Sequence, residues 1–278
     1  MKRARRNFGG PLETIGLLLL LLCAGTACER PYKVVAPKQE ASFTNSIGMT
    51  FVHIPPGTFV MGSPEKEKGR RDDEQEHFVT LTRGFYCQVT EVTQGQWLEV
   101  MGKNPSHFQD CGDDCPVEFV SWKDCKQFIR QLNRREGIST YRLPTEAEWE
   151  FACRAGSQTA FATGTILETG CGLVPYLDAL GWYCGNSGKR PHPAARKGPN
   201  AFGLYDMHGN MWEWCEDWYG AYPLDHVTDP TGPPSGAARV LRGGGWHEDA
   251  EDCRSAIRVA RSPESKAGTL GFRVVRTP

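Results

Sequence analysis

The sequence predicts a loop-rich α+β domain. Glycine and proline are frequent, at 31 and 19 of 278 residues, and long helical patterns are scarce, which argues against a layered α/β fold. The segment 200–258 places three tryptophans within seven residues, among glycines and acidic side chains. Its spacing follows neither the helical nor the strand period for long. We therefore expect buried, irregular backbone here, because each tryptophan or tyrosine ring buries roughly 150–250 Å² when packed.

Residues 1–27 have the layout of a secretory signal. Basic residues open the chain, an apolar run follows at 15–23, and small residues lead up to Ala27. The run is shorter than the ~20 residues that a spanning helix needs. Cys28 follows directly and favours a lipoprotein signal with an acylated Cys28, while ordinary cleavage after Ala27 is the alternative. The polar segment 28–44 then reads as a flexible tether, and 45–278 as one domain.

Charge and motif spacing exclude several classes of function. The net charge is −1, so nothing indicates a nucleic-acid partner. The charged runs 65–77 and 249–252 are expected to be solvated loops. The histidines lack zinc-ligand spacing, and the chain has no P-loop, no dinucleotide-binding glycine pattern and no nucleophile elbow.

Nine cysteines follow Cys28, in keeping with an exported protein whose disulfides persist. Short separations favour the pairs Cys111–Cys115 and Cys171–Cys184. Cys215 and Cys253 lie in the two halves of the tryptophan-rich segment and are expected to join them. A buried free thiol and a reactive thiol are the alternatives for Cys253. The remaining cysteines are Cys87, Cys125 and Cys153.

Local patterns predict strands in the first third of the domain and three short helices. Strands are expected at 50–54 and 58–62, forming a hairpin across Pro55-Pro56-Gly57, and at 78–81 and 85–89. Helices are expected to begin after Thr93, Ser121 and Thr145, and Ser121 and Thr145 have an acidic residue three positions later. Gly156 is expected to end the last helix in a left-handed conformation. The glutamates of that helix are interpreted as structural.

Several ordered blocks between Asn45 and Arg276 resemble the formylglycine-generating enzyme (sulfatase-modifying factor) family. The blocks are NSIGMTFVHIPPGTFVMGS, FYCQVTEVTQGQW, PVEFVSWKD, YRLPTEAEWEFACRAG, GLYDMHGNMWEWCEDWY, RGGGW, CRSAIR and GFRVVR. The resemblance implies a C-type-lectin-like fold with short helices and small antiparallel sheets. A shared fold does not fix the activity.

In the resembled oxidase, two cysteines bind Cu(I), which drives the O₂-dependent oxidation of a substrate cysteine to formylglycine. The register from Arg242-Gly243-Gly244 places Glu248 at the first of these cysteines and Cys253 at the second. A carboxylate is a hard ligand that suits Cu(I) poorly, so we expect copper to be absent and the oxidase activity to be lost. His247 with the acidic side chains around it is a candidate hard-metal or acid/base site, but an exposed acidic loop is the favoured interpretation.

The resemblance also implies a structural calcium site. Its ligands here are the side chain of Asp206, the carbonyls of Gly209 and Met211, and the side chain of Glu213, all hard oxygen donors. The alternative is that the two carboxylates only accept backbone hydrogen bonds. A second family site begins at a segment matched by Asn186 and Ser187, but its other ligands fall in a stretch that is missing here.

Three functional hypotheses follow. The favoured one is a cell-envelope lipoprotein, anchored in a membrane by its lipid, whose domain binds a peptide, polypeptide or glycan. The second is a copper oxidase in which Cys253 works with another thiol, from Cys87, Cys125 or Cys153. The third is a structural envelope protein held by disulfides.

Overall fold

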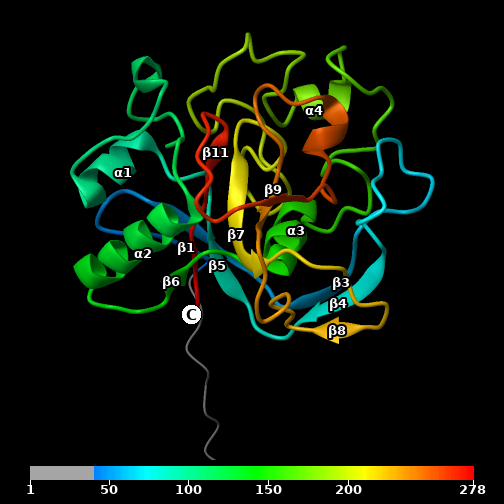
Figure 1. The fold of residues 1–278 in the computed structure, drawn as a ribbon, viewed down its shortest axis with the longest axis horizontal. Coiled ribbons are helices and arrows are strands. Elements are labelled where there is room, and N and C mark those ends of the chain that lie inside the picture. The colour runs from blue at the N-terminus through cyan, green and yellow to red at the C-terminus, as the bar shows by residue number, and fades with distance from the viewer. Residues whose placement is uncertain (1–40) are drawn as a thin grey trace, which may run out of the picture. The chain divides into compact units, whose positions relative to one another are not determined.

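The computed structural model describes residues 41–278, which form three small sheets and several short helices (Figure 1). The helices are α1 (Gln94–Met101), α2 (Trp122–Glu136), α3 (Glu146–Arg154) and α4 (Pro175–Asp178), with the 3-10 helices η1 (Gln109–Cys111) and η2 (Ala250–Cys253). Within this range no helix is both long enough and apolar enough to cross a membrane. The predicted signal segment and acylation site Cys28, and the tether as far as residue 40, lie outside the described residues.

The largest sheet joins the two ends of the domain. Its order is β1 (Ser42–Thr44), β2 (Thr50–Ile54), β5 (Phe85–Gln88), β12 (Val275–Arg276) and β6 (Tyr141–Arg142), and every neighbouring pair is antiparallel. β1 pairs with β2 over three residues, so the end of the expected tether belongs to the sheet.

The second sheet is central in Figure 1 and has the order β10 (Val259–Arg261), β9 (Arg239–Arg242), β7 (Trp212–Trp218) and β11 (Leu270–Gly271). The third sheet is β3 (Gly57–Met61), β4 (His77–Leu81) and β8 (Val227–Thr228). β11 runs parallel to β7, and β8 runs parallel to β4. The loop-rich α+β prediction is confirmed, but two of the three small sheets are mixed rather than antiparallel.

The three predicted helices begin at the predicted caps. Thr93, Ser121 and Thr145 each accept a bond from the backbone N–H three residues on, and the side chain there bonds back. These reciprocal bonds satisfy amides that have no partner inside the helix. One detail differs, because the left-handed cap of α3 is Ala155, with φ 46°, and Gly156 follows it.

The predicted hairpin of β2 with β3 is wrong, although both strands exist. β2 pairs with β5 over four residue pairs, and β3 pairs with β4 over five, in a different sheet. Pro55 and Pro56 therefore carry the chain from one sheet to another rather than turning it back.

The tryptophan-rich segment contains more regular structure than expected. Residues 212–218 form β7, which pairs with β9 through an irregular register between Trp214 and Trp218. Irregular backbone remains before β7, where Asp206, Gly209 and Asn210 have positive φ, and in the loops that follow β7 and β9. The sequence of 212–218 does not alternate regularly between apolar and polar residues, because both faces of this central strand are largely buried.

Buried arginine–carboxylate pairs join α3, β7, β9 and the neighbouring loops in the core. They are Arg242 with Glu150 and Glu146, Arg154 with Glu150, Arg254 with Glu67 and Glu74, Arg258 with Glu146, and Arg273 with Glu213. The expectation of a solvated loop at 65–77 is therefore wrong for two of its residues. Glu67 and Glu74 both hold the buried Arg254 guanidinium, at 2.7 Å.

Candidate functional site

The loop after β9 folds back closely against η2. Gly243 and Gly244 have φ of 98° and 78°, a region that favours glycine. A Cβ on Gly244 would lie 2.5 Å from the Asp252 carbonyl oxygen and 2.7 Å from Cys253 Sγ. Glycine is therefore required where this loop packs against Cys253.

Glu248 is fixed on this loop by three contacts. Its Oε1 accepts from Trp212 Nε1 at 2.9 Å, and its backbone oxygen accepts from the Cys184 N–H at 3.0 Å. The exposed His247 has its Nε2 3.6 Å from the same Oε1. The position that carries the first copper cysteine in the resembled enzymes is thus a half-buried, hydrogen-bonded carboxylate.

Cys253 is a fully buried free thiol, and the predicted Cys215–Cys253 disulfide is wrong. Cys215 lies on β7 in the cluster with Trp149, whereas Cys253 packs in a separate cluster with Phe161. Burial is the largest cause that raises the pKa of the Cys253 thiol well above 9, and the Glu248 carboxylate is the next largest. Burial therefore disfavours the thiolate form of Cys253, which is the form that binds Cu(I).

Cys153, His208 and Ser255 form a buried polar group behind Cys253. Cys153 Sγ lies 3.6 Å from His208 Nε2 and 3.7 Å from Ser255 Oγ. His208 Nε2 accepts from the Ala162 N–H at 3.1 Å, so Nδ1 carries the proton and donates to the Cys253 carbonyl oxygen at 2.8 Å. Burial lowers the pKa of His208 to about 4 and raises that of Cys153 to about 12. A neutral thiol and a neutral imidazole serve packing here.

The other cysteines considered as partners of Cys253 are also buried. Cys87 lies on β5 and Cys125 on α2, each within a hydrophobic cluster. Burial raises the pKa of Cys87 to about 12 and that of Cys125 well above 9. Burial thus disfavours the thiolate in all three candidate partners, Cys87, Cys125 and Cys153, as it does in Cys253.

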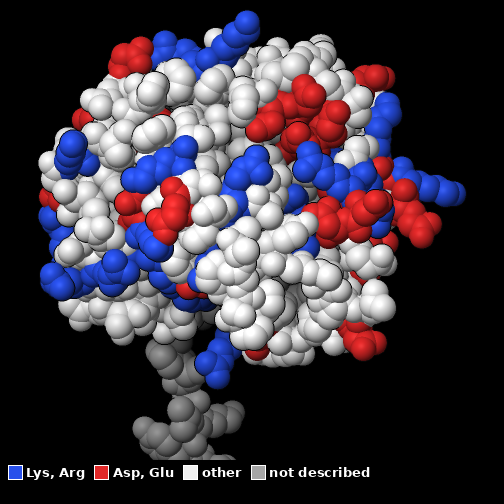
Figure 2. Space-filling model, viewed as in Figure 1, with Lys and Arg blue, Asp and Glu red and all other residues white. Residues whose placement is uncertain are grey.

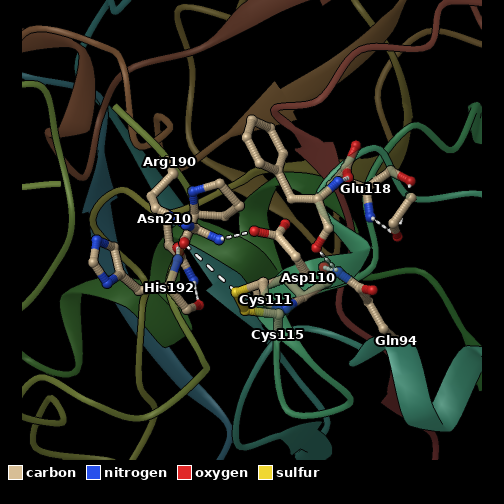
Figure 3. The surroundings of a disulfide bond; sticks show 12 residues. Gln94, Asp110, Cys111, Cys115, Glu118, Arg190, His192 and Asn210 are labelled. Carbon is tan, nitrogen blue, oxygen red and sulfur yellow. Dashed lines mark hydrogen bonds and ion pairs between the residues drawn. A yellow bond between two sulfur atoms is a disulfide. The ribbon is translucent and has the colours of Figure 1, made fainter. Parts of the chain in front are cut away.

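Both disulfides with short separations are confirmed, Cys111–Cys115 and Cys171–Cys184. Figure 3 shows the first beside the segment that holds Arg190 and His192. Cys111 Sγ lies 3.6 Å from the Pro191 carbonyl oxygen, and Arg190 Nη2 donates to Asp110 at 2.9 Å. Disulfides persist outside the cytosol, so they indicate an extracellular or cell-envelope protein.

The acidic loop holds one cluster with metal-ligand chemistry. Within residues 41–278, Cys171, Cys184 and Asp249 alone gather three cysteine, histidine or acidic ligand atoms within 4.8 Å. Both sulfurs are joined to each other, so the cluster lacks thiolates. Asp252 pairs with Arg71 at 2.6 Å. On the face in Figure 2, acidic and basic side chains are interspersed, with an acidic patch over the η2 segment.

A row of aromatic rings runs from the segment before α2 to the loop that holds Glu248. In order, the ring centroids of Phe119, His107, Phe108, Trp246 and His247 lie 5.8, 6.3, 5.6 and 5.1 Å apart. All five side chains are exposed or half-buried, and Phe119 keeps 39% of its surface exposed. No sequence pattern indicates this aromatic row, because its members come from three separated segments.

The four residues of the expected calcium site fit an ion unevenly. Asp206 is buried and its Oδ1 has no hydrogen-bond partner, as expected of an oxygen reserved for a cation. Glu213 does not fit, because Arg273 occupies both of its oxygens at 2.7 Å and Trp149 Nε1 also donates to Oε2. The Gly209 carbonyl oxygen accepts from the Met211 N–H at 2.9 Å.

A model of the sulfatase-modifying factor enzyme 1-like domain matches residues 37–278. The chain belongs to this family. Among relatives of the sulfatase-modifying factor domain, the formylglycine-generating enzyme of Streptomyces coelicolor is 37% identical over 197 residues, covering 64% of this chain and 59% of the enzyme. The bovine enzyme is 33% identical over 204 residues, covering 64% and 50%. The matches thus span only about half to three-fifths of these two relatives.

With other similar proteins, the match spans a larger share of their length. Chaperone protein LppX of Paenibacillus barcinonensis is 28% identical over 248 residues, covering 72% of this chain and 82% of LppX. Among solved structures, Treponema denticola variable protein 1 has a TM-score of 0.77 and 30% identity, covering 86% of this chain and all of that one. PvdO from Pseudomonas aeruginosa has a TM-score of 0.74 and 29% identity, covering 87% and 100%. The predicted formylglycine-generating-enzyme, C-type-lectin-like fold is confirmed.

Proposed function

We propose that this sulfatase-modifying factor domain is a binding module for a polypeptide segment. The observation that carries the proposal is the aromatic row Phe119–His107–Phe108–Trp246–His247. Aromatic side chains dominate the binding energy of protein interfaces, because they bury large apolar area at low entropic cost. The relative LppX is named a chaperone protein, which supports a polypeptide over a glycan as the ligand.

The polypeptide-binding proposal predicts that Phe119→Ser weakens binding of an unfolded, carboxymethylated protein by about tenfold, since one interface hot spot is worth about 1–2 kcal/mol. Phe78→Ser is the matched control. Phe78 is 58% exposed and also lies near a histidine ring, His226 at 6.2 Å, but it belongs to β4 outside the row. Fluorescence anisotropy measures both affinities. Equal affinities for the two variants, or competition by an oligosaccharide, would contradict the polypeptide-binding surface.

We also infer that the domain does not use copper. A carboxylate, Glu248, occupies the place of one copper ligand, and the buried, protonated Cys253 occupies the other. The second candidate function is the oxidase, which is favoured by the similarity to formylglycine-generating enzymes. The protonated state of each described free thiol counts against it.

A calcium ion is proposed as a structural cofactor at the loop before β7. The buried Asp206 Oδ1, which has no hydrogen-bond partner, supports this site. The ion would supply a positive charge to pair with the buried carboxylate. The uneven fit of Glu213 calls for another donor.

We propose further that the chain is anchored in the cell envelope through acylated Cys28. The disulfides support an exported protein, and the sequence places Cys28 directly after small residues. The Cys28→Ser chain is expected to appear in the soluble fraction, whereas the natural chain sediments with membranes. Membrane association of Cys28→Ser equal to that of the natural chain would refute the anchor.

A further inference from the structure

Three buried carboxylate oxygens in residues 41–278 have no hydrogen-bond partner: Glu91 Oε2, Glu118 Oε2 and Asp206 Oδ1. Glu91 and Glu118 are fully buried, and Asp206 is 1% exposed. A buried charge without a partner is costly, so each of these oxygens needs a proton or a cation. Glu118 stands alone beside Gly268, but Glu91 and Asp206 lie in adjoining segments.

The backbone brings Glu91 and Asp206 together. The Tyr205 N–H donates to the Val89 carbonyl oxygen at 2.9 Å, which places the segment of Asp206 against that of Glu91. The other oxygen of each carboxylate is held. Asn210 Nδ2 donates to Glu91 Oε1 at 3.0 Å, and the Ala195 N–H donates to Asp206 Oδ2 at 2.7 Å. Each side chain is thus fixed while one oxygen is left over.

The nearby arginine does not neutralise this pair. Arg273 directs Nε and Nη2 at both oxygens of Glu213, and its remaining bonds go to the carbonyl oxygens of Gln88, Val89 and Tyr205. One guanidinium therefore faces three carboxylates, and a divalent cation would restore neutrality.

We propose that Glu91 and Asp206 are the two carboxylate ligands of a calcium ion, and that Glu213 is a positioning residue that holds Arg273. The inference rests on the calcium proposal and changes its ligand set. Carboxylate oxygens are the donors that calcium prefers, and two of them are free here. Nothing in the spacing of the sequence relates Glu91 to Asp206, which lies 115 positions later, so the ligand pair emerges only from the fold.

The test uses Tb³⁺ as a calcium probe on the full chain, with luminescence excited through tryptophan and Ca²⁺ as competitor. We expect one Tb³⁺ per chain, displaced by Ca²⁺. Glu91→Gln and Asp206→Asn should each weaken its binding at least tenfold, and Glu91→Asp should restore part of it. Glu118→Gln is the matched control, because it removes an equally buried carboxylate that also has an unpartnered oxygen. The Glu213→Gln variant should bind Tb³⁺ with an affinity within about threefold of that of the natural chain, while its melting temperature falls.

The outcomes separate the two proposals. Loss of binding in Glu213→Gln with no change in Glu91→Gln would keep calcium but overturn this ligand pair. Absence of stoichiometric Tb³⁺ or Ca²⁺ binding to the natural chain would overturn both proposals. Binding of equal strength in all variants would place the ion elsewhere and would likewise overturn the ligand pair. Melting with excess Ca²⁺ or a chelator gives a second readout, since a bound ion stabilises the folded state.

Discussion

Replacing Glu150 by alanine is expected to destabilise the folded domain by about 3–5 kcal/mol. Glu150 is fully buried, and its Oε1 accepts from Arg154 Nε at 2.8 Å and from the Gly62 N–H at 2.9 Å. Its Oε2 pairs with Arg242, which is also fully buried. The substitution leaves two guanidinium groups in the core without their shared carboxylate, and water cannot reach them to compensate.

Glu99→Ala is the control for charge removal. Glu99 pairs with Arg135 at 2.6 Å, but its side chain is 55% exposed and that of Arg135 is 42% exposed. Exposed pairs contribute about 0–1 kcal/mol, so this variant should unfold close to the natural protein. Urea unfolding followed by tryptophan fluorescence gives both free energies. A loss below 1 kcal/mol for Glu150→Ala would show that the buried network does not stabilise the fold.

The second large effect concerns Asp217, whose carboxyl group should favour the folded state only while it is protonated. Asp217 is 3% exposed and lines a cavity of about 330 Å³, together with Glu146, Trp218 and Tyr222. Its pKa is raised to about 8, mainly by burial and next by the Glu146 charge. Glu148 and Glu216 act in the same direction.

The raised pKa fixes the sign of the pH dependence. A folded state that holds its proton more tightly loses stability as the pH rises from the unfolded value of 3.8 through about 8. Asp217→Asn keeps an oxygen that accepts the Glu146 N–H and removes the titration. It should therefore be more stable than the natural chain at pH 9, by on the order of 6 kcal/mol, because the pKa of Asp217 rises from 3.8 to about 8 on folding and each pKa unit is worth about 1.4 kcal/mol.

Unfolding free energies at pH 5, 7 and 9 measure this difference, which should grow with pH and level off above 8. Asp229→Asn serves as the control of opposite sign. Thr82 donates to both oxygens of Asp229 and lowers its pKa, so its loss should not stabilise the domain at high pH. A stability difference between Asp217→Asn and the natural chain that stays constant from pH 5 to 9 would contradict a raised pKa.

Local signals predicted local structure well. Thr93, Ser121 and Thr145 marked the starts of α1, α2 and α3, because a capping box is completed within four residues. Short separation also predicted Cys111–Cys115 and Cys171–Cys184. The resemblance to the formylglycine-generating enzymes supplied the fold class, which local patterns alone leave open.

Interactions between distant segments escaped the sequence. β2 and β3 have adjacent sequences that suit a hairpin, yet each finds its partner in a different sheet. Cys215 and Cys253 seemed matched by position, but β7 and η2 bury them in different clusters. The aromatic row and the pair Glu91–Asp206 also come from segments that are far apart in the sequence, so no periodic pattern predicts them.

The central proposal is that a carboxylate and a buried thiol replace the two-sulfur copper site of the resembled oxidases. Competition for Cu(I) with bicinchoninic acid, on the fully folded chain under anaerobic conditions, tests it most directly. We predict that the chelator keeps the copper and that a peptide with a sulfatase-type cysteine motif is not oxidised when air is then admitted to the copper-treated chain. One Cu(I) bound per chain, together with conversion of the peptide cysteine to formylglycine in air, would contradict the proposal.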